Sequence, residues 1–135
     1  MLDRIDHVGV AVADLDAALA LYERDFAIEA SHRETLEGHG VEAALLDIGE
    51  SHVELLAPID ADSPISRFLA ARGPGLHHVA YQTADIDAEL ARLKEAGVQL
   101  IDDTPRRGLR NSRVAFVHPS SVGGVLTEIT EPSRG

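Results

Sequence analysis

Two stretches of this sequence repeat one another and decide the fold: DHVGVAVADLDAALA at Asp6–Ala20 and HHVAYQTADIDAELA at His77–Ala91. They align without a gap at a constant offset of 71 residues, so His7 matches His78 and Leu19 matches Leu90. The alignment preserves both residue identity and the apolar pattern, which chance explains poorly. The sequence therefore predicts a duplicated structural module.

Each copy of the repeat predicts a strand followed by a helix. Residues 7–13 form a Val-rich apolar run, as a strand favours, and Asp14 then stands at the N-cap of a helix. In the second copy the strand covers 79–83 and Asp85 is the corresponding cap. Gly97 is expected to end the second helix as the residue after its C-cap.

Three further strands are expected after each helix, so each half is predicted to be a βαβββ module. In the first half they cover 27–33, 41–48 and 52–56, and in the second half 99–102, 113–117 and 125–130. A short linker helix over 63–72 is predicted between the modules, with Ser63 at the N-cap and Pro64 at the first helical position. We therefore predict an α+β fold of two paired βαβββ modules in one domain over 1–135. Module 1 spans about 3–57 and module 2 about 76–131. We expect one domain and not two, because half a sheet has unpaired edges and cannot stand alone.

Composition narrows the class of function. The 135 residues are 44% hydrophobic and 26% charged, with a net charge of −11, and this acidic surface disfavours nucleic-acid binding. No apolar run approaches the roughly 20 residues that span a bilayer, so we expect no membrane association. Cysteine is absent, which excludes disulfide and thiol chemistry and is compatible with the cytoplasmic location that we expect.

Four arginines gather in the second half despite the acidic charge: Arg106, Arg107, Arg110 and Arg113. They have two interpretations of similar weight. One is a solvated loop. The other is an anion-binding patch for a phosphorylated ligand, since the guanidinium fork suits phosphate.

The repeat also pairs residues that bind metals. His7 and His78 open equivalent strands, and Glu54 in VELL and Glu128 in TEIT stand among apolar residues of later strands. A carboxylate in such a strand is costly to bury unless it is paired or coordinated, although either Glu could point outward instead. Two imidazoles and two carboxylates suit Mn, Fe, Co, Ni or Zn. His77 is the alternative to His78, but the repeat register favours His78.

The sequence resembles the vicinal oxygen chelate superfamily and, within it, the methylmalonyl-CoA epimerase family. The resemblance covers nearly the whole chain and rests on IDHVGVAVADLD, GESHVELLAPIDADSPISRFLA, GLHHVAYQTADIDAEL, GVQLIDDTPRRG and FVHPSSVGGVLTEIT. It implies a glyoxalase-like curved sheet around a divalent metal (Co, Mn, Ni or Zn) and a homodimer. The metal ligands of the family fall on His7, Glu54, His78 and Glu128.

The resemblance also implies the reaction, interconversion of (R)- and (S)-methylmalonyl-CoA through an enolate, with an acyl-CoA as substrate. A general acid/base is required, and Glu42 in GHGVEAALL is the candidate that the resemblance suggests, with Glu37 as a second. Glu128 is a further catalytic candidate, but not as sole base, because a bound cation lowers the basicity of a carboxylate. The Arg106–Arg113 segment could meet the CoA phosphates.

Two other functions compete with this reading. A glyoxalase-type lactoylglutathione lyase also uses two His and two Glu around a metal. A metal-free binding protein of the same fold would not need those four residues. An extradiol-type dioxygenase normally uses two His and one carboxylate, so the fourth predicted ligand argues against it.

Overall fold

The computed structural model describes residues 1–134, so Gly135, the last residue of the predicted domain, lies outside the described residues. It contains two compact units. One is Val8–His77, and the other joins Met1–His7 to the chain from His78 onward. Strands β1 (Leu2–Ala11) and β5 (Gly75–Thr83) run through both units.

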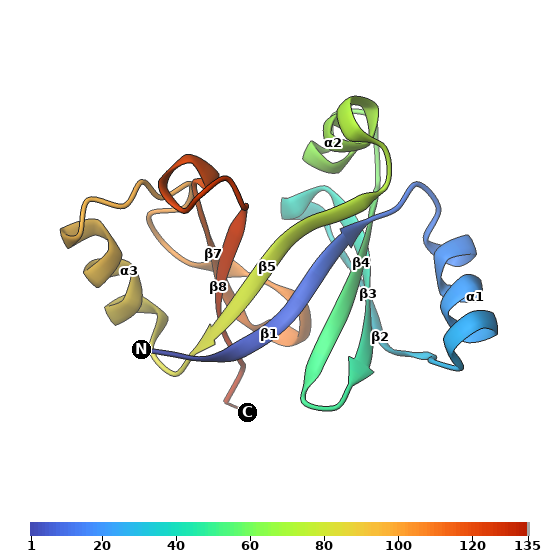
Figure 1. Cartoon of the computed structure of the whole chain (residues 1–135), viewed down its shortest axis with the longest axis horizontal. Coiled ribbons are helices and arrows are strands. Elements are labelled where there is room, and N and C mark those ends of the chain that lie inside the picture. The colour runs from blue at the N-terminus through green and yellow to red at the C-terminus, as the bar shows by residue number, and fades with distance from the viewer. Residues whose placement is uncertain (135) are drawn as a thin grey trace. The chain divides into compact units, whose positions relative to one another are not determined.

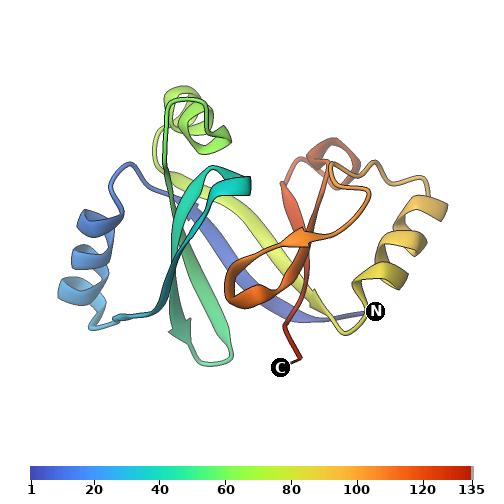
Figure 2. The ribbon, with the colours of Figure 1, turned by 180° about the vertical axis from the view of Figure 1, so that it is seen from behind.

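The unit Val8–His77 is a β-sheet covered on one face by a helix (Figure 1). Its elements are α1 (Leu15–Phe26), β2 (Ala30–Leu36), the 3₁₀ turn η1 (Glu37–His39), β3 (Val41–Ile48), β4 (Ser51–Pro58) and α2 (Pro64–Arg72). The strand order is β2-β3-β4-β1, with β2, β3 and β4 antiparallel. Seen from behind in Figure 2, α1 again lies beside these strands.

The core of this unit lies between α1 and one face of its sheet. Leu15 of α1 packs with Ala44 and Leu46 of β3 and with Leu55 and Ala57 of β4. Because alternate residues of a strand point to opposite faces, these contacts assign the even-numbered residues of β3 to the helix side.

Local chemistry sets both ends of α1. The Asp14 carboxylate accepts a hydrogen bond from the Ala17 amide at 3.1 Å, as an N-cap should. At the other end Ala27 adopts a left-handed conformation with φ 57° and donates its amide to the Glu23 carbonyl, while the Ile28 amide donates to the Tyr22 carbonyl. Asp14 is therefore confirmed as the predicted N-cap of α1.

The second unit repeats this plan. Its elements after β5 are α3 (Ile86–Glu95), β6 (Arg106–Arg107), η2 (Leu109–Asn111), β7 (Arg113–Val117), η3 (Pro119–Ser121) and β8 (Thr127–Glu131). The strand order is β1-β5-β8-β7-β6, with β5 parallel to β8 and β7 antiparallel to it. Its core joins Ile86 and Leu90 of α3 to Ala115, Val117 and Ile129 of the sheet.

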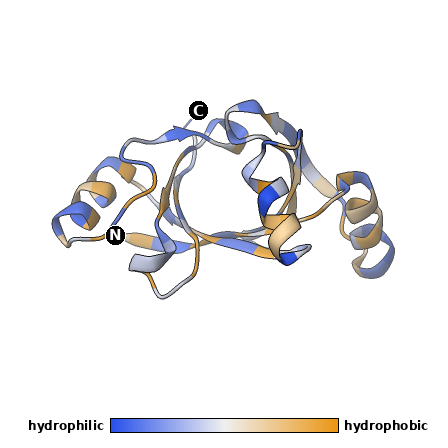
Figure 3. Cartoon of the chain, turned by 90° about the horizontal axis from the view of Figure 1, so that it is seen from above, coloured by the Kyte–Doolittle hydropathy of each residue, from blue (hydrophilic) through white to orange (hydrophobic). Residues whose placement is uncertain are grey.

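The same cap chemistry recurs in α3. Asp85 accepts from the Ala88 amide at 3.1 Å, as its repeat partner Asp14 does in α1. Gly97 follows the C-cap with φ 82°, the conformation expected of the residue that ends a helix. Figure 3 shows hydrophobic and hydrophilic residues mixed along both α1 and α3, as helices with one packed face require.

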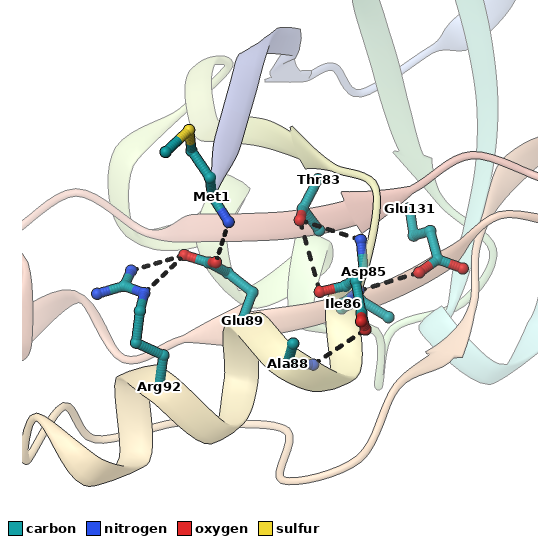
Figure 4. A network of polar contacts seen from close by, with 8 residues as sticks. All are labelled: Met1, Thr83, Asp85, Ile86, Ala88, Glu89, Arg92 and Glu131. Atoms are coloured by element: carbon teal, nitrogen blue, oxygen red, sulfur yellow. Dashed lines mark hydrogen bonds and ion pairs between the residues drawn. The ribbon is translucent and has the colours of Figure 1, made fainter.

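A polar network fastens α3 to the two strand ends beside it (Figure 4). The Glu131 side chain at the end of β8 accepts from the Ile86 amide at 3.0 Å. One turn along the helix, Glu89 accepts from the Met1 ammonium at 2.8 Å and from Arg92 at 2.6 and 3.1 Å. The network therefore ties the strand that begins near Met1, and also β8, to the same helix.

The predicted strands agree with the structure to different degrees. Predicted strands 41–48 and 113–117 are confirmed to the residue as β3 and β7, and α2 occupies the place of the predicted linker helix. The predicted strand 99–102 is wrong, because only an isolated bridge from Leu100 to Val117 forms there.

Among the described residues, no helix has the length and apolar character needed to cross a bilayer.

Candidate metal centre

His7 and His78 project from neighbouring positions of two strands. His7 lies on β1 and is 4% exposed, and His78 lies on β5 and is 3% exposed. Their Nε2 atoms are 3.1 Å apart, with the rings edge to face at 5.2 Å between centroids. Two imidazoles that come from positions 71 residues apart thus direct the same nitrogen at one point.

Glu128 brings a carboxylate to the same place. In the parallel pairing of β5 with β8, Glu128 lies opposite Ala80, which shares a face of β5 with His78. Its two oxygens lie 3.4 Å from the Nε2 of His7 and 3.7 Å from the Nε2 of His78. Glu128 is 5% exposed, so a charged group here is held away from bulk water.

The donor set fits a divalent metal. Two donors that bind one ion at right angles, each about 2.1 Å from it, lie about 3.0 Å apart. The imidazole nitrogens at 3.1 Å and the nearer nitrogen–oxygen distance of 3.4 Å are close to that spacing. Imidazole nitrogen and carboxylate oxygen are also the donors that Mn, Co, Ni and Zn accept. His7, His78 and Glu128 can therefore hold such an ion.

His77, the alternative ligand, faces elsewhere. Its ring meets the ring of Phe68 edge to face at 4.9 Å. Burial lowers the pKa of the His77 imidazole below its ordinary value. Neighbouring residues of a strand point to opposite faces, so β5 can present only one of its two histidines to His7.

Asp6 is a functional candidate that the sequence reasoning missed. Its carboxylate oxygen lies 2.7 Å from the Nδ1 of His7, on the side of the ring away from Nε2. Carboxylates commonly orient metal-binding histidines in this way. The sequence signal for this role is the acidic residue directly before a candidate histidine ligand, in the DHV segment that opens the repeat.

Glu54 lies on the face of β4 that turns away from α1. It pairs with Leu45 across β3, whereas its neighbours Val53 and Leu55 join the core under α1. Glu54 is 7% exposed. A buried carboxylate is retained only where it is paired or coordinated.

Glu42, the predicted base, lies on the opposite face of the same sheet. It pairs with Ala57, which belongs to the core under α1. Its carboxylate accepts from Arg33 at 2.7 Å, and Arg33 also binds Asp16 of α1 at 2.7 Å. Hydrogen bonds to Glu42 and then to Asp16 raise the pKa of the Arg33 guanidinium, which keeps this group cationic. The structure thus places Glu42 in a surface ion-pair cluster.

The register puts a different acidic residue on the face of Glu54. Glu34 of β2 lies across from Ala43, whose partner on β4 is Leu56, two residues along both strands from the Glu54–Leu45 pair and therefore on the same face. Its carboxylate lies 2.9 Å from the Nε2 of His32, and its side chain is 17% exposed. The other candidate, Glu37, is exposed on η1.

The four arginines do not act as one patch. Arg113 on β7 binds Asp87 at 3.0 Å and lies 3.6 Å from Glu131, so it is held by two carboxylates. Arg106 lies 3.2 Å from Asp102. Arg107 and Arg110 are exposed.

Comparison with known proteins places this fold and site in a family. The profile of the glyoxalase/bleomycin resistance protein/dioxygenase superfamily matches residues 6–116. An uncharacterised Bacillus subtilis protein, YqjC, is 38% identical over 131 residues, covering 97% of this chain and 94% of its own length. The mitochondrial methylmalonyl-CoA epimerase of Bos taurus is 36% identical over 131 residues, covering 96% of this chain and 75% of its own.

A solved structure extends the similarity to three dimensions. The Streptomyces coelicolor methylmalonyl-CoA epimerase in complex with 2-nitronate-propionyl-CoA matches with a TM-score of 0.95 and 41% identity. The match covers 99% of this chain and 97% of that one. The α+β fold predicted from the repeat and the glyoxalase-like sheet implied by the family resemblance are both confirmed. This chain therefore belongs to the methylmalonyl-CoA epimerase family of the glyoxalase/bleomycin resistance protein/dioxygenase superfamily.

Proposed function

We propose that this protein is a metal-dependent epimerase that interconverts (R)- and (S)-methylmalonyl-CoA. The observation that carries the proposal is the convergence of the Nε2 atoms of His7 and His78 with the carboxylate of Glu128. Family membership supports the substrate class, because related proteins are named for this substrate and one is solved with an acyl-CoA ligand. A nitronate such as that ligand is a planar anion, as is an enolate.

We propose Glu54 as the fourth ligand. Its support is twofold: it is buried, and it is the first-half counterpart of Glu128 in the sequence repeat. The resulting set of two nitrogens and two oxygens suits Co, Mn, Ni or Zn and leaves coordination positions for substrate oxygens. Resemblance to the family also supports a homodimer, which light scattering would test by a mass twice that of one chain.

The chemistry required of the site is proton transfer at carbon. The α-proton lies between a thioester and a carboxylate, and its removal gives an enolate. A divalent ion supplies Lewis-acid stabilisation of the developing oxyanion, worth several kcal/mol in general terms. Inversion then requires that a proton return to the other face of the carbon.

The chain's own carboxylates must carry these protons. Glu128 is one proposed carrier, but coordination lowers the basicity of a carboxylate, so a second group is required. The family resemblance suggests Glu42 as this second proton carrier, but Glu42 lies on the α1 face of the sheet and is bound to Arg33. We therefore propose Glu34 for this role, because Glu34 shares a face of the sheet with Glu54.

The CoA phosphates need cations on a surface of net charge −11. We propose that Arg106, Arg107 and Arg110 provide them. Arg113 bridges Asp87 and Glu131 and so has a structural role in the second unit.

Proton NMR of (R)-methylmalonyl-CoA in D2O tests the proposed function. The expected result is metal-dependent loss of the α-proton signal and appearance of the S epimer. Chelated enzyme and His78→Ala should both be inactive, while Asp3→Asn on the exposed start of β1 should match wild type. A wild-type protein that binds metal without exchanging the proton would instead indicate another chelate enzyme, such as a glyoxalase-type isomerase. A protein that binds no metal would favour a binding module.

A further inference from the structure

The orientation of the His7 ring is controlled from its Nδ1 side. The Asp6 carboxylate lies 2.7 Å from Nδ1, while Nε2 points to His78 and Glu128 at 3.1 and 3.4 Å. A neutral imidazole carries one proton, which can sit on either nitrogen. A carboxylate beside Nδ1 draws the proton there, so the lone pair is left on Nε2.

Only the Nε2 lone pair is useful at this place. A proton on Nε2 would stand between His7 and its neighbours and would block coordination by that nitrogen. A carboxylate placed as Asp6 is favours the binding-competent tautomer and restrains the rotation of the ring at the same time. The Asp6 side chain is 20% exposed and that of His7 is 6% exposed, so the hydrogen bond lies at the edge of the buried donor set.

The residue that precedes the candidate ligand differs between the two copies of the repeat. The position that corresponds to Asp6 in the second copy is His77, whose ring turns to Phe68. The ring of His78 instead meets Phe116 edge to face at 5.4 Å. The duplication provides two candidate histidine ligands, and an acidic residue directly precedes His7 but not His78.

We propose that Asp6 is a positioning residue for the metal centre, which sets the tautomer and orientation of His7 and thereby raises metal affinity. This inference rests on the metal-dependent function proposed above. Asparagine at position 6 keeps the size of the side chain but loses its charge, and its amide can donate to Nδ1 and favour the wrong tautomer. Removal of such an orienting partner typically weakens metal binding about 10- to 100-fold.

The test measures binding and tautomer, not turnover. Co²⁺ and Zn²⁺ dissociation constants of Asp6→Asn and Asp6→Ala are compared with wild type by chelator competition. Asp3→Asn, an exposed aspartate on the same strand, is the matched control. Long-range ¹H–¹⁵N spectra of the metal-free proteins report which nitrogen of His7 carries the proton.

The expected result is a rise of about 10- to 100-fold in the dissociation constants of both Asp6 variants, with Asp3→Asn unchanged. The His7 proton should sit on Nδ1 in wild type and shift to Nε2 in Asp6→Asn. Unchanged metal affinity in both variants, or an Nε2-protonated His7 in wild type, overturns the inference. If wild type binds metal but does not exchange the substrate proton, the epimerase proposal fails while the role of Asp6 stands. If wild type binds no metal, both fail.

Discussion

Glu89 offers a sharp test of how the second unit is held together. Its side chain is 3% exposed, yet it carries a carboxylate bound to the Met1 ammonium and to Arg92 (Figure 4). We predict that Glu89→Gln destabilises the protein at neutral pH, because the amide keeps the shape but loses both charge-assisted contacts. Glu95→Gln at the exposed end of the same helix is the matched control.

The size of the effect follows from the exposure of the partners. A hydrogen bond to a charged group contributes about 1.5–3 kcal/mol. The side chains of Met1 and Arg92 are 96% and 60% exposed, so both residues lie at the surface and their charged groups regain water once the carboxylate is gone. We therefore expect the low end of that range, about 1.5–2 kcal/mol. At about 2.1 cal/mol/K of unfolding entropy per residue, this corresponds to a fall in Tm of roughly 5–7 °C.

The stabilisation should depend on pH in a defined direction. Hydrogen bonds from Arg92 and then from the Met1 ammonium lower the pKa of Glu89 from its ordinary value of 4.5. A carboxylate with a lowered folded-state pKa stabilises the protein above its unfolded-state pKa, and this contribution is lost as pH falls through the folded-state pKa. The wild-type advantage over Glu89→Gln should thus be full at pH 7 and should shrink progressively below about pH 4.5.

Urea denaturation at pH 7 and at pH 3.5, followed by circular dichroism, measures both quantities. A Glu89→Gln variant within 0.3 kcal/mol of the Glu95→Gln control at pH 7, an interval well below the roughly 1.5 kcal/mol expected, would refute the ion-pair reasoning. So would a stability gap that widens as pH falls, because the sign of the linkage would then be reversed.

Three other predictions concern the first unit and the substrate. Ala27→Gly should raise the free energy of unfolding by about 0.5 kcal/mol in urea titrations, because relief of left-handed strain exceeds the chain entropy that glycine adds; a loss of stability would contradict this. Glu34→Gln should slow α-proton exchange at least about 100-fold in NMR assays while Glu42→Gln stays near wild type, in keeping with the usual size of acid/base catalysis; the reverse pattern would restore Glu42 as the base. Charge reversal at Arg106 and Arg107 should raise the KM for the CoA substrate about tenfold with kcat little changed, and unchanged kinetics would remove these residues from CoA binding.

Much of the fold could be predicted because its signals are local. Asp14 and Asp85 act as N-caps through hydrogen bonds to amides three residues away, so neighbouring sequence suffices to place both helix starts. The edges of β3 and β7 follow from short apolar runs of strand-forming residues. Residues 99–102 were wrongly predicted to be a strand. They form a single bridge to β7, between Leu100 and Val117, and the amides of Ile101 and Asp102 both donate to the Phe116 carbonyl, which is not the pattern of a regular ladder.

The site separates what sequence determines from what packing decides. Duplication by itself predicted the candidate ligands His7, Glu54, His78 and Glu128, because they are two pairs of equivalent residues in two similar modules. It could not say which face of a strand a residue occupies, since a shift of one position reverses every side chain. That choice was made by the pairing of β3 with β4, which puts Glu42 on the α1 face of the sheet and Glu54 on the other face. Tertiary structure likewise brings the Nε2 atoms of His7 and His78 to 3.1 Å from one another, because only folding can bring together residues 71 positions apart in the chain.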